Sequence, residues 1–232
     1  PWLIYEPGSL HLCNSLFPTD PPATPCEATT DLESAYSPLT GRSHSFHIDA
    51  STPHIASPDV HVDHKSKRIV MYFHGLESYA KQTSRVATST DGIDFTVLPE
   101  ILGRSYFRVF QYNAWSFALA MPGQLYRSRD GLSGFERGPM LFNPNMRHSA
   151  LFIHNNALQV FWTEVGHNPE AILHSSIDLS SDWMDWKESS PVEILRPEFS
   201  WEGADAPLTS SVRSTAYGHV NQLRDPAVYV EN

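Results

Sequence analysis

Short apolar runs rich in aromatic and β-branched residues recur along the chain and end in glycine. Three of them span residues 69–75 (Ile-Val-Met-Tyr-Phe-His-Gly), 115–123 and 157–166. Runs of this length between turn residues predict β-strands. Almost no stretch shows the 3.6-residue periodicity of an amphipathic helix. The hydrophobic pattern therefore predicts an all-β protein.

Each run is followed by a second strand that ends in a Ser-x-Asp turn. The turns lie at residues 89–91, 128–130 and 176–178, which are 39 and 48 residues apart, and an aromatic residue follows each of them. Propeller blades repeat at roughly 40–50 residues, and neighbouring blades cover each other's faces. The repeat predicts a β-propeller with whole blades at about 55–100, 104–142 and 147–196.

The two ends of the chain resemble parts of such blades. Residues 2–5 (Trp-Leu-Ile-Tyr) resemble the outer strand at 183–186, and residues 224–228 (Arg-Asp-Pro-Ala-Val) resemble the first residues of the inner strands. We expect one incomplete domain over residues 1–232: the tail of blade 1, blades 2–4 and the start of blade 5. If tail and start shared one blade the total would be four, but that blade would lack its middle strands. Residues 11–53 and 196–222 are expected to be long inter-blade loops.

Charge narrows the range of partners. The formal net charge is −10, from 16 basic and 26 acidic residues, which argues against nucleic acid or an anionic membrane as the partner. The sequence contains no run of about 18 apolar residues, so no membrane-spanning helix is predicted. We expect a monomer that handles a neutral substrate with carboxylates.

The compartment stays open at this stage. The sequence begins at Pro1, so a signal peptide could have preceded it. Cys13 and Cys26 would form a loop-closing disulfide in an exported protein and two free thiols in a cytoplasmic one.

Polar residues cluster where the predicted inner strands begin, at residues 54–59, 104–108, 145–149 and 222–226. In a propeller these positions face a shared central cavity. Charged groups aimed at one axis are costly to bury unless they are paired or used. We therefore predict a ring of ligand-facing groups there, although Arg147 and His148 could instead form an inter-blade ion pair. The predicted binding residues of this ring are His54, His74, Arg108, Arg147, His148 and Arg224.

Three short motifs resemble the five-bladed propellers of glycoside hydrolase family 43 and its relatives. They are Asp-Pro at 225–226, Ser-Pro-Asp-Val at 57–60 and Tyr-Phe-His-Gly at 72–75, and the likeness covers roughly residues 54–232. The resemblance implies inverting hydrolysis by an aspartate base, an orienting aspartate and a glutamic acid that protonates the leaving group. The aspartate that the family carries on its first blade would lie upstream of Pro1.

The resemblance implies roles for three acidic residues. Asp225 matches the Asp-Pro strand start, and Asp59 lies at the equivalent depth in another blade. The family's Glu-Gly-Pro acid motif is absent, and Glu202-Gly203 is the nearest match. Two carboxyl groups of different proton affinity are required across the glycosidic bond. We expect Asp59 or Asp225, flanked by arginines, to stay ionised and Glu202, beside a Trp201 that could stack on a sugar, to be protonated.

Structural interpretations of the same residues stay open. An aspartate at the start of a strand often only caps a turn, and Glu202 could be a solvated loop residue. Glu164, on an apolar strand, is a further candidate for a cavity-facing carboxylate.

The sequence thus predicts a glycoside hydrolase acting on an oligo- or polysaccharide. The alternatives are a non-catalytic carbohydrate-binding propeller and a glycoside phosphorylase, which would need basic groups for phosphate. No cofactor is predicted, although the resemblance leaves room for a structural cation at the central channel near His148. Six histidines lie between residues 44 and 74, but the hairpin around His61 and His64 favours a solvated turn, so no metal site is predicted.

Overall fold

A computed structural model describes residues 53–78, 81–213, 216 and 218–230. The predicted tail at residues 2–5, nearly all of the loop 11–53 and both cysteines lie outside these residues. The described chain is all-β, as predicted; its helical elements are two short 3₁₀ turns, η2 (Trp183–Asp185) and η3 (Ser200–Glu202). Neither of these turns is long enough to cross a membrane.

Three antiparallel sheets follow one another along the chain, each with its strands in sequence order. The first sheet contains β1 (Ile55–Asp63), β2 (Arg68–Ser78), β3 (Lys81–Ser89) and β4 (Thr96–Val97), and the short β5 (Gly103–Arg104) also pairs with β3. The second contains β6 (Arg108–Tyr112), β7 (Trp115–Ala120), β8 (Gln124–Ser128) and β9 (Glu136–Met140). The third contains β10 (Met146–His154), β11 (Ala157–Glu164), β12 (Ile172–Asp178) and β13 (Val192–Leu195).

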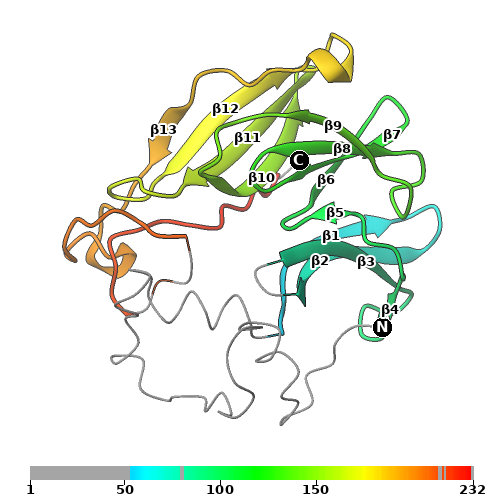
Figure 1. Cartoon of the computed structure of the whole chain (residues 1–232), viewed down its shortest axis with the longest axis horizontal. Helices are drawn as coiled ribbons and strands as arrows, with labels where there is room; N and C mark the ends of the chain where they lie inside the picture. Colours follow the sequence, from blue (N-terminus) through cyan, green and yellow to red (C-terminus); the bar gives the residue numbers. More distant parts are fainter. Residues whose placement is uncertain (1–52, 79–80, 214–215, 217, 231–232) are drawn as a thin grey trace, which may run out of the picture.

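The three sheets fan out as propeller blades, with β1, β6 and β10 at the inner side and β4 and β13 at the periphery (Figure 1). Hydrogen bonds from β6 to both other inner strands hold the fan together: Arg108 Nε donates to Ser149 O at 2.9 Å and Arg108 Nη1 to Ser57 O at 3.1 Å. The sheet boundaries agree with the three predicted blades. The total of five blades stays a prediction.

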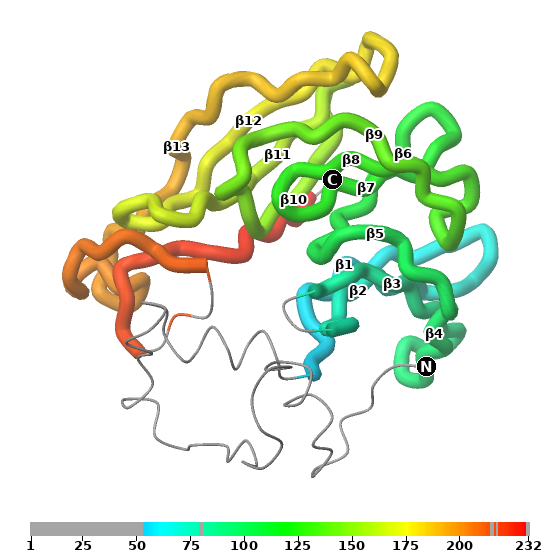
Figure 2. Tube along the Cα trace, in the orientation of Figure 1, coloured from blue at the N-terminus to red at the C-terminus, as the bar shows by residue number. Residues whose placement is uncertain are grey.

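The segment after residue 217 runs back toward the inner strands (Figure 2). Its described residues form no strand, but Gln222 makes an isolated parallel bridge with Glu170. This bridge places the predicted start of the next blade beside the third sheet.

The second sheet, the middle one of the three, is apolar on both faces because a blade packs against each face. Side chains alternate across a strand. In β7, Phe117 and Leu119 belong to one buried cluster, shared with Leu158 of the third sheet. Ala118 and Ala120 belong to the other, shared with residues of the first sheet. This two-sided burial explains why the predicted strands are continuous apolar runs and not alternating ones.

The first two Ser-x-Asp turns form as predicted. Asp91 accepts the N–H groups of Ile93 and Asp94, both at 2.9 Å, while Ser89 Oγ accepts that of Gly92 at 2.8 Å. Asp130 and Ser128 repeat the arrangement in the second sheet. The third turn is built differently, because Ser176 bonds Ser189 and Asp178 accepts from Ser180. The third strand therefore also ends at its Ser-x-Asp turn, but only the aspartate keeps the bond made in the first two turns.

A tryptophan locks the second blade to the third. Trp183 of η2 is buried, and its ring centroid lies 5.9 Å from that of Phe117. The Arg127 guanidinium stacks on the indole, with Cζ 4.3 Å from the ring centroid. Gly138 in β9 leaves room for this ring, since a Cβ there would lie 2.2 Å from Trp183.

We expect Gly138→Ala to destabilise the fold by about 1–3 kcal/mol, because the new methyl must displace a packed indole ring. Urea unfolding of the full chain measures this loss. Gly134→Ala is the control, because nothing lies within 4 Å of its Cβ position and its cost is limited to the positive φ of 58°. The explanation fails if Gly138→Ala is no more destabilising than Gly134→Ala.

Candidate functional site

Four residues at or near the predicted starts of successive inner strands adopt a left-handed backbone. They are Ser57 (φ 53°), Tyr106 (φ 63°), His148 (φ 48°) and Asp225 (φ 51°). Each non-glycine residue in this region costs roughly 1–2 kcal/mol. At Ser57 and His148 the strand register also shifts, as in a β-bulge. Because such strain is concentrated at functional sites, this fourfold repetition marks the place to look for one.

The four residues are here called the inner-strand row. The Tyr106 ring lies 4.5 Å from that of His74 in the first sheet and 5.2 Å from that of His148. His148 Nδ1 lies 3.8 Å from Asp225 Oδ2. The row therefore runs continuously from the first sheet to the segment after residue 217.

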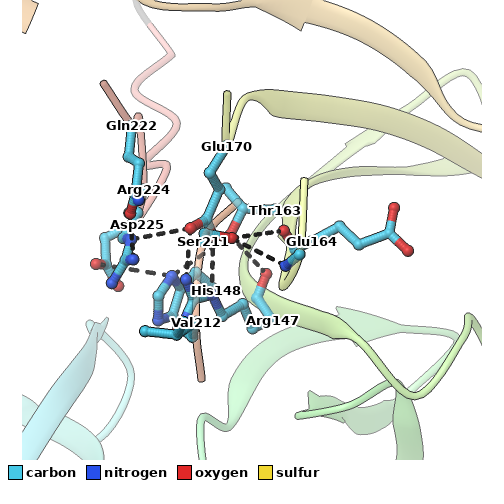
Figure 3. A network of polar contacts seen from close by, with 11 residues as sticks. Arg147, His148, Thr163, Glu164, Glu170, Ser211, Val212, Gln222, Arg224 and Asp225 are labelled. Carbon is cyan, nitrogen blue, oxygen red and sulfur yellow. Dashed lines mark hydrogen bonds and ion pairs between the residues drawn. The ribbon is translucent and has the colours of Figure 1, made fainter. Parts of the chain in front are cut away.

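Beside the row, one buried carboxylate holds two arginines (Figure 3). Arg147 Nε donates to Glu170 Oε1 at 2.8 Å and Arg147 Nη2 to Oε2, while Arg224 Nε lies 2.9 Å from Oε2. Glu170 is fully buried, and Arg147 nearly so. Arg147 Nη1 also donates to Val212 O at 3.1 Å. The ion pair joins two positions of the third sheet to the segment that carries Arg224.

The electrostatics of this group favour an ionised Glu170. Burial opposes its ionisation, but the hydrogen bond and charge of Arg147 and the charge of Arg224 outweigh it and hold the pKa of Glu170 below its ordinary value. Breaking such a buried pair on one side typically costs about 3–5 kcal/mol.

His148 is kept neutral. Burial lowers its pKa to about 4, although the carboxylate of Asp225 acts in the opposite direction. The Asp225 side chain is 61% exposed, so it is the accessible carboxylate of this group. The arrangement offers an exposed anionic acceptor beside an uncharged imidazole and a phenol.

Two further predicted residues line the same region from the first sheet. His74 is buried, with its ring 4.5 Å from Tyr106 and 5.9 Å from that of His54. Burial and the neighbouring positive groups lower the pKa of His74 to about 4. His54 shares a 3.0 Å hydrogen bond with Gln82.

Asp59 and Arg108 bond mainly to backbone. Asp59 Oδ2 accepts the N–H of Val109 at 2.7 Å and lies 2.9 Å from His61 Nε2. Arg108 donates to the backbone carbonyls of Ser149 in β10, of Ser57 in β1 and of Phe107, the residue before β6. Both side chains thus connect neighbouring inner strands, whereas the structural alternative considered for Asp59 was the capping of a turn.

Trp201 and Glu202 lie on η3, and the contacts of both side chains are local. Trp201 is 79% exposed and stacks on Phe199 with a centroid distance of 5.7 Å. Glu202 Oε2 accepts the backbone N–H groups of Glu198 and Phe199 at 2.8 and 3.1 Å. Among the described residues, no contact joins either side chain to the inner-strand row. Glu164 accepts from Asn143 Nδ2 at 2.9 Å and points away from His148 (Figure 3).

Sequence reasoning overlooked Glu170 and Tyr106. The acidic residue of Pro169-Glu170-Ala171, immediately before an apolar strand, was a usable signal for Glu170. The alternative considered for Arg147 was an ion pair between blades, whereas its partner Glu170 precedes β12 of the same sheet. The described residues contain no group of three or more histidine, cysteine or acidic side chains placed to hold a metal ion.

No protein-family model matches the chain. A curated relative, the uncharacterized protein R118 of Acanthamoeba polyphaga mimivirus, is 31% identical over 246 residues. The match includes 97% of this chain and 62% of the viral protein, so the chain spans less than two thirds of that relative.

Several solved structures are similar to parts of this chain at low identity. An exo-β-1,3-galactanase from Phanerochaete chrysosporium aligns with 62% of this chain and 36% of its own, at 14% identity and a TM-score of 0.49. The alignment with a family 117 glycoside hydrolase from Zobellia galactanivorans covers 62% of this chain and 49% of the hydrolase, at 14% identity and a TM-score of 0.43. The alignment with a β-1,2-mannobiose phosphorylase from Listeria innocua covers 61% of this chain and 59% of the phosphorylase, at 11% identity and a TM-score of 0.47. At this level of likeness they do not identify a function for this chain.

The two buried neutral histidines predict acid sensitivity. Unfolded histidines bind protons below about pH 6.5, whereas His74 and His148 do so only near pH 4. Between these values the unfolded state binds more protons, so stability falls as the pH falls, by up to about 1.4 kcal/mol per pH unit for each histidine.

Urea unfolding from pH 7 to pH 4 measures this slope, and His74→Gln should reduce it by up to half. Exposed His64 provides the control, because His64→Gln should leave the slope as it is. An unchanged slope in His74→Gln would rule out a neutral buried His74.

Proposed function

We propose that the chain binds a carbohydrate over the inner-strand row and hydrolyses a glycosidic bond there, with Asp225 as the carboxylate that acts on the sugar. The observation that carries the proposal is the exposed Asp225 carboxylate, held in a strained conformation beside neutral His148. Strain of this kind persists only where the surrounding structure enforces it.

The chemistry of the row suits a polyhydroxylated ligand. Asp225 accepts hydrogen bonds from hydroxyl groups, and Tyr106 and the neutral histidines both donate and accept them. Aromatic faces also pack against the C–H faces of sugars. The uncharged phenol and imidazoles fit a neutral sugar. A neutral ligand also agrees with the net charge of −10.

In hydrolysis Asp225 would take the proton of the attacking water. A second carboxyl group must protonate the leaving oxygen, at about 6.5–9.5 Å from the base in an inverting enzyme. Glu202 is our candidate, and it would exchange its two backbone hydrogen bonds for the leaving group.

Phosphorolysis is the less suitable reaction for this site. Arg147 and Arg224 are already engaged by Glu170, and Arg108 donates to carbonyl groups. Phosphate would therefore have to displace existing partners. Carbohydrate binding without cleavage is the second candidate, favoured by the local bonding of Glu202.

Asp225→Asn tests the proposal. The amide cannot accept the proton of water, so turnover should fall at least about 100-fold on the saccharide cleaved by the wild type. The full chain is first screened on aryl glycosides and polysaccharides, with and without phosphate. Asp205→Asn is the matched control, because Asp205 is equally exposed at 61% and also pairs with a histidine.

The outcomes separate the alternatives. Full activity of Asp225→Asn rejects the assignment. Saccharide binding without turnover in the wild type selects the binding function, and turnover only with phosphate selects the phosphorylase.

Trp201→Ala should weaken the affinity for a bound polysaccharide by about 5-fold, since stacking on an aromatic ring contributes on the order of 1 kcal/mol. Isothermal titration calorimetry measures the change. Ile93→Ala removes a comparably exposed apolar side chain, 82% exposed, and should have no effect. Equal affinity in wild type and Trp201→Ala excludes Trp201 from the binding surface.

A further inference from the structure

We propose that Glu170 is a positioning residue, whose buried carboxylate sets the separation of His148 and Asp225 by holding the two arginines that precede them in the sequence. The inference deepens the proposed function and rests on it for the use of the site. The geometry itself involves no ligand.

The sequence relation is the first part of the argument. Arg147 is followed directly by His148, and Arg224 directly by Asp225. Consecutive Cα atoms lie about 3.8 Å apart, so fixing each arginine closely restricts the next residue. The two restricted residues both have the left-handed backbone and come within 3.8 Å of each other.

One carboxylate serves both arginines. Oε1 accepts a hydrogen bond from Arg147 Nε at 2.8 Å. Oε2 accepts one from Arg147 Nη2 and also lies 2.9 Å from Arg224 Nε. Because Arg147 is held by a two-point fork, its direction as well as its distance is fixed. Figure 3 shows Arg147 and Arg224 both reaching to Glu170.

The backbone at Glu170 supplies a second, independent attachment. Leu223 N donates to Glu170 O at 2.8 Å, so the segment stays beside the third sheet even when the side chain is changed. A variant of the side chain therefore tests positioning apart from docking of the segment.

Glu170→Asp is the informative variant, because it keeps the negative charge and shortens the side chain by one methylene. The shorter carboxylate cannot serve both arginines in their present places. We expect His148 and Asp225 to lose their coupling while the chain remains folded, as judged by its amide NMR spectrum.

The readout is the ¹⁵N NMR shift of the His148 ring at pH 7. In the wild type, Asp225→Asn should change this shift; in the Glu170→Asp background the same substitution should change it by less than about half as much. An equal change in both backgrounds overturns the proposal. If Glu170→Asp does not fold, Arg224→Lys, which keeps the charge and loses the contact through Nε, is used in the same cycle.

Glu77→Asp is the control background. Glu77 makes a comparable pair with Arg85, through Nε at 3.1 Å and Nη2 at 2.9 Å, within the first sheet. The coupling should remain there, and its loss would show a general loosening of the fold and reject a specific role for Glu170. Because no saccharide is used, the result is independent of whether the proposed function is right.

Discussion

The pairing of the buried Glu170 carboxylate with Arg147 and Arg224 is the interaction on which the arrangement of the site depends. It is electrostatically demanding, because ions removed from water must be compensated nearly completely. The structure meets this demand with two guanidinium groups on one carboxylate. Together with the backbone hydrogen bond from Leu223 N to Glu170 O, this pairing holds the segment around Asp225 beside the third sheet.

The blades provide the rigid frame for that interaction. The second sheet is apolar on both faces: Phe117 packs toward the third sheet and Ala118 toward the first. Trp183, stacked on Arg127 and accommodated by Gly138, extends the same principle to the outer edge. A frame packed from both sides can sustain the left-handed backbone of Ser57, Tyr106, His148 and Asp225, which an isolated strand would relax.

The site combines two kinds of polar group. Asp59 and Arg108 bond to backbone and join inner strands, whereas Asp225 remains exposed beside His148. The distinction matters for function, because only a group with free acceptor capacity can serve a ligand. Similar residues at equivalent strand starts thus have different tasks, depending on what the adjacent strand presents.

Much of the fold was predictable from local sequence. The lengths of the apolar runs, the glycines that end them and the first two Ser-x-Asp turns depend on short-range hydrogen bonding and on side-chain alternation, so blades 2–4 could be delimited in advance. The sequence also predicted polar side chains converging from several strands, and His74, Arg147, His148, Arg224 and Asp225 do lie close together. That they form a functional site stays a prediction.

The tertiary structure alone decided which partner each charge has. Glu170 lies 23 residues from Arg147, and it faces that arginine only because β11 folds back on β10. The left-handed backbone of Tyr106 likewise has no local sequence signal, since a bulky residue ordinarily avoids it and only packing enforces it. Local patterns determine strands and turns, but the pairing of buried charges depends on distances across sheets, which no local pattern contains.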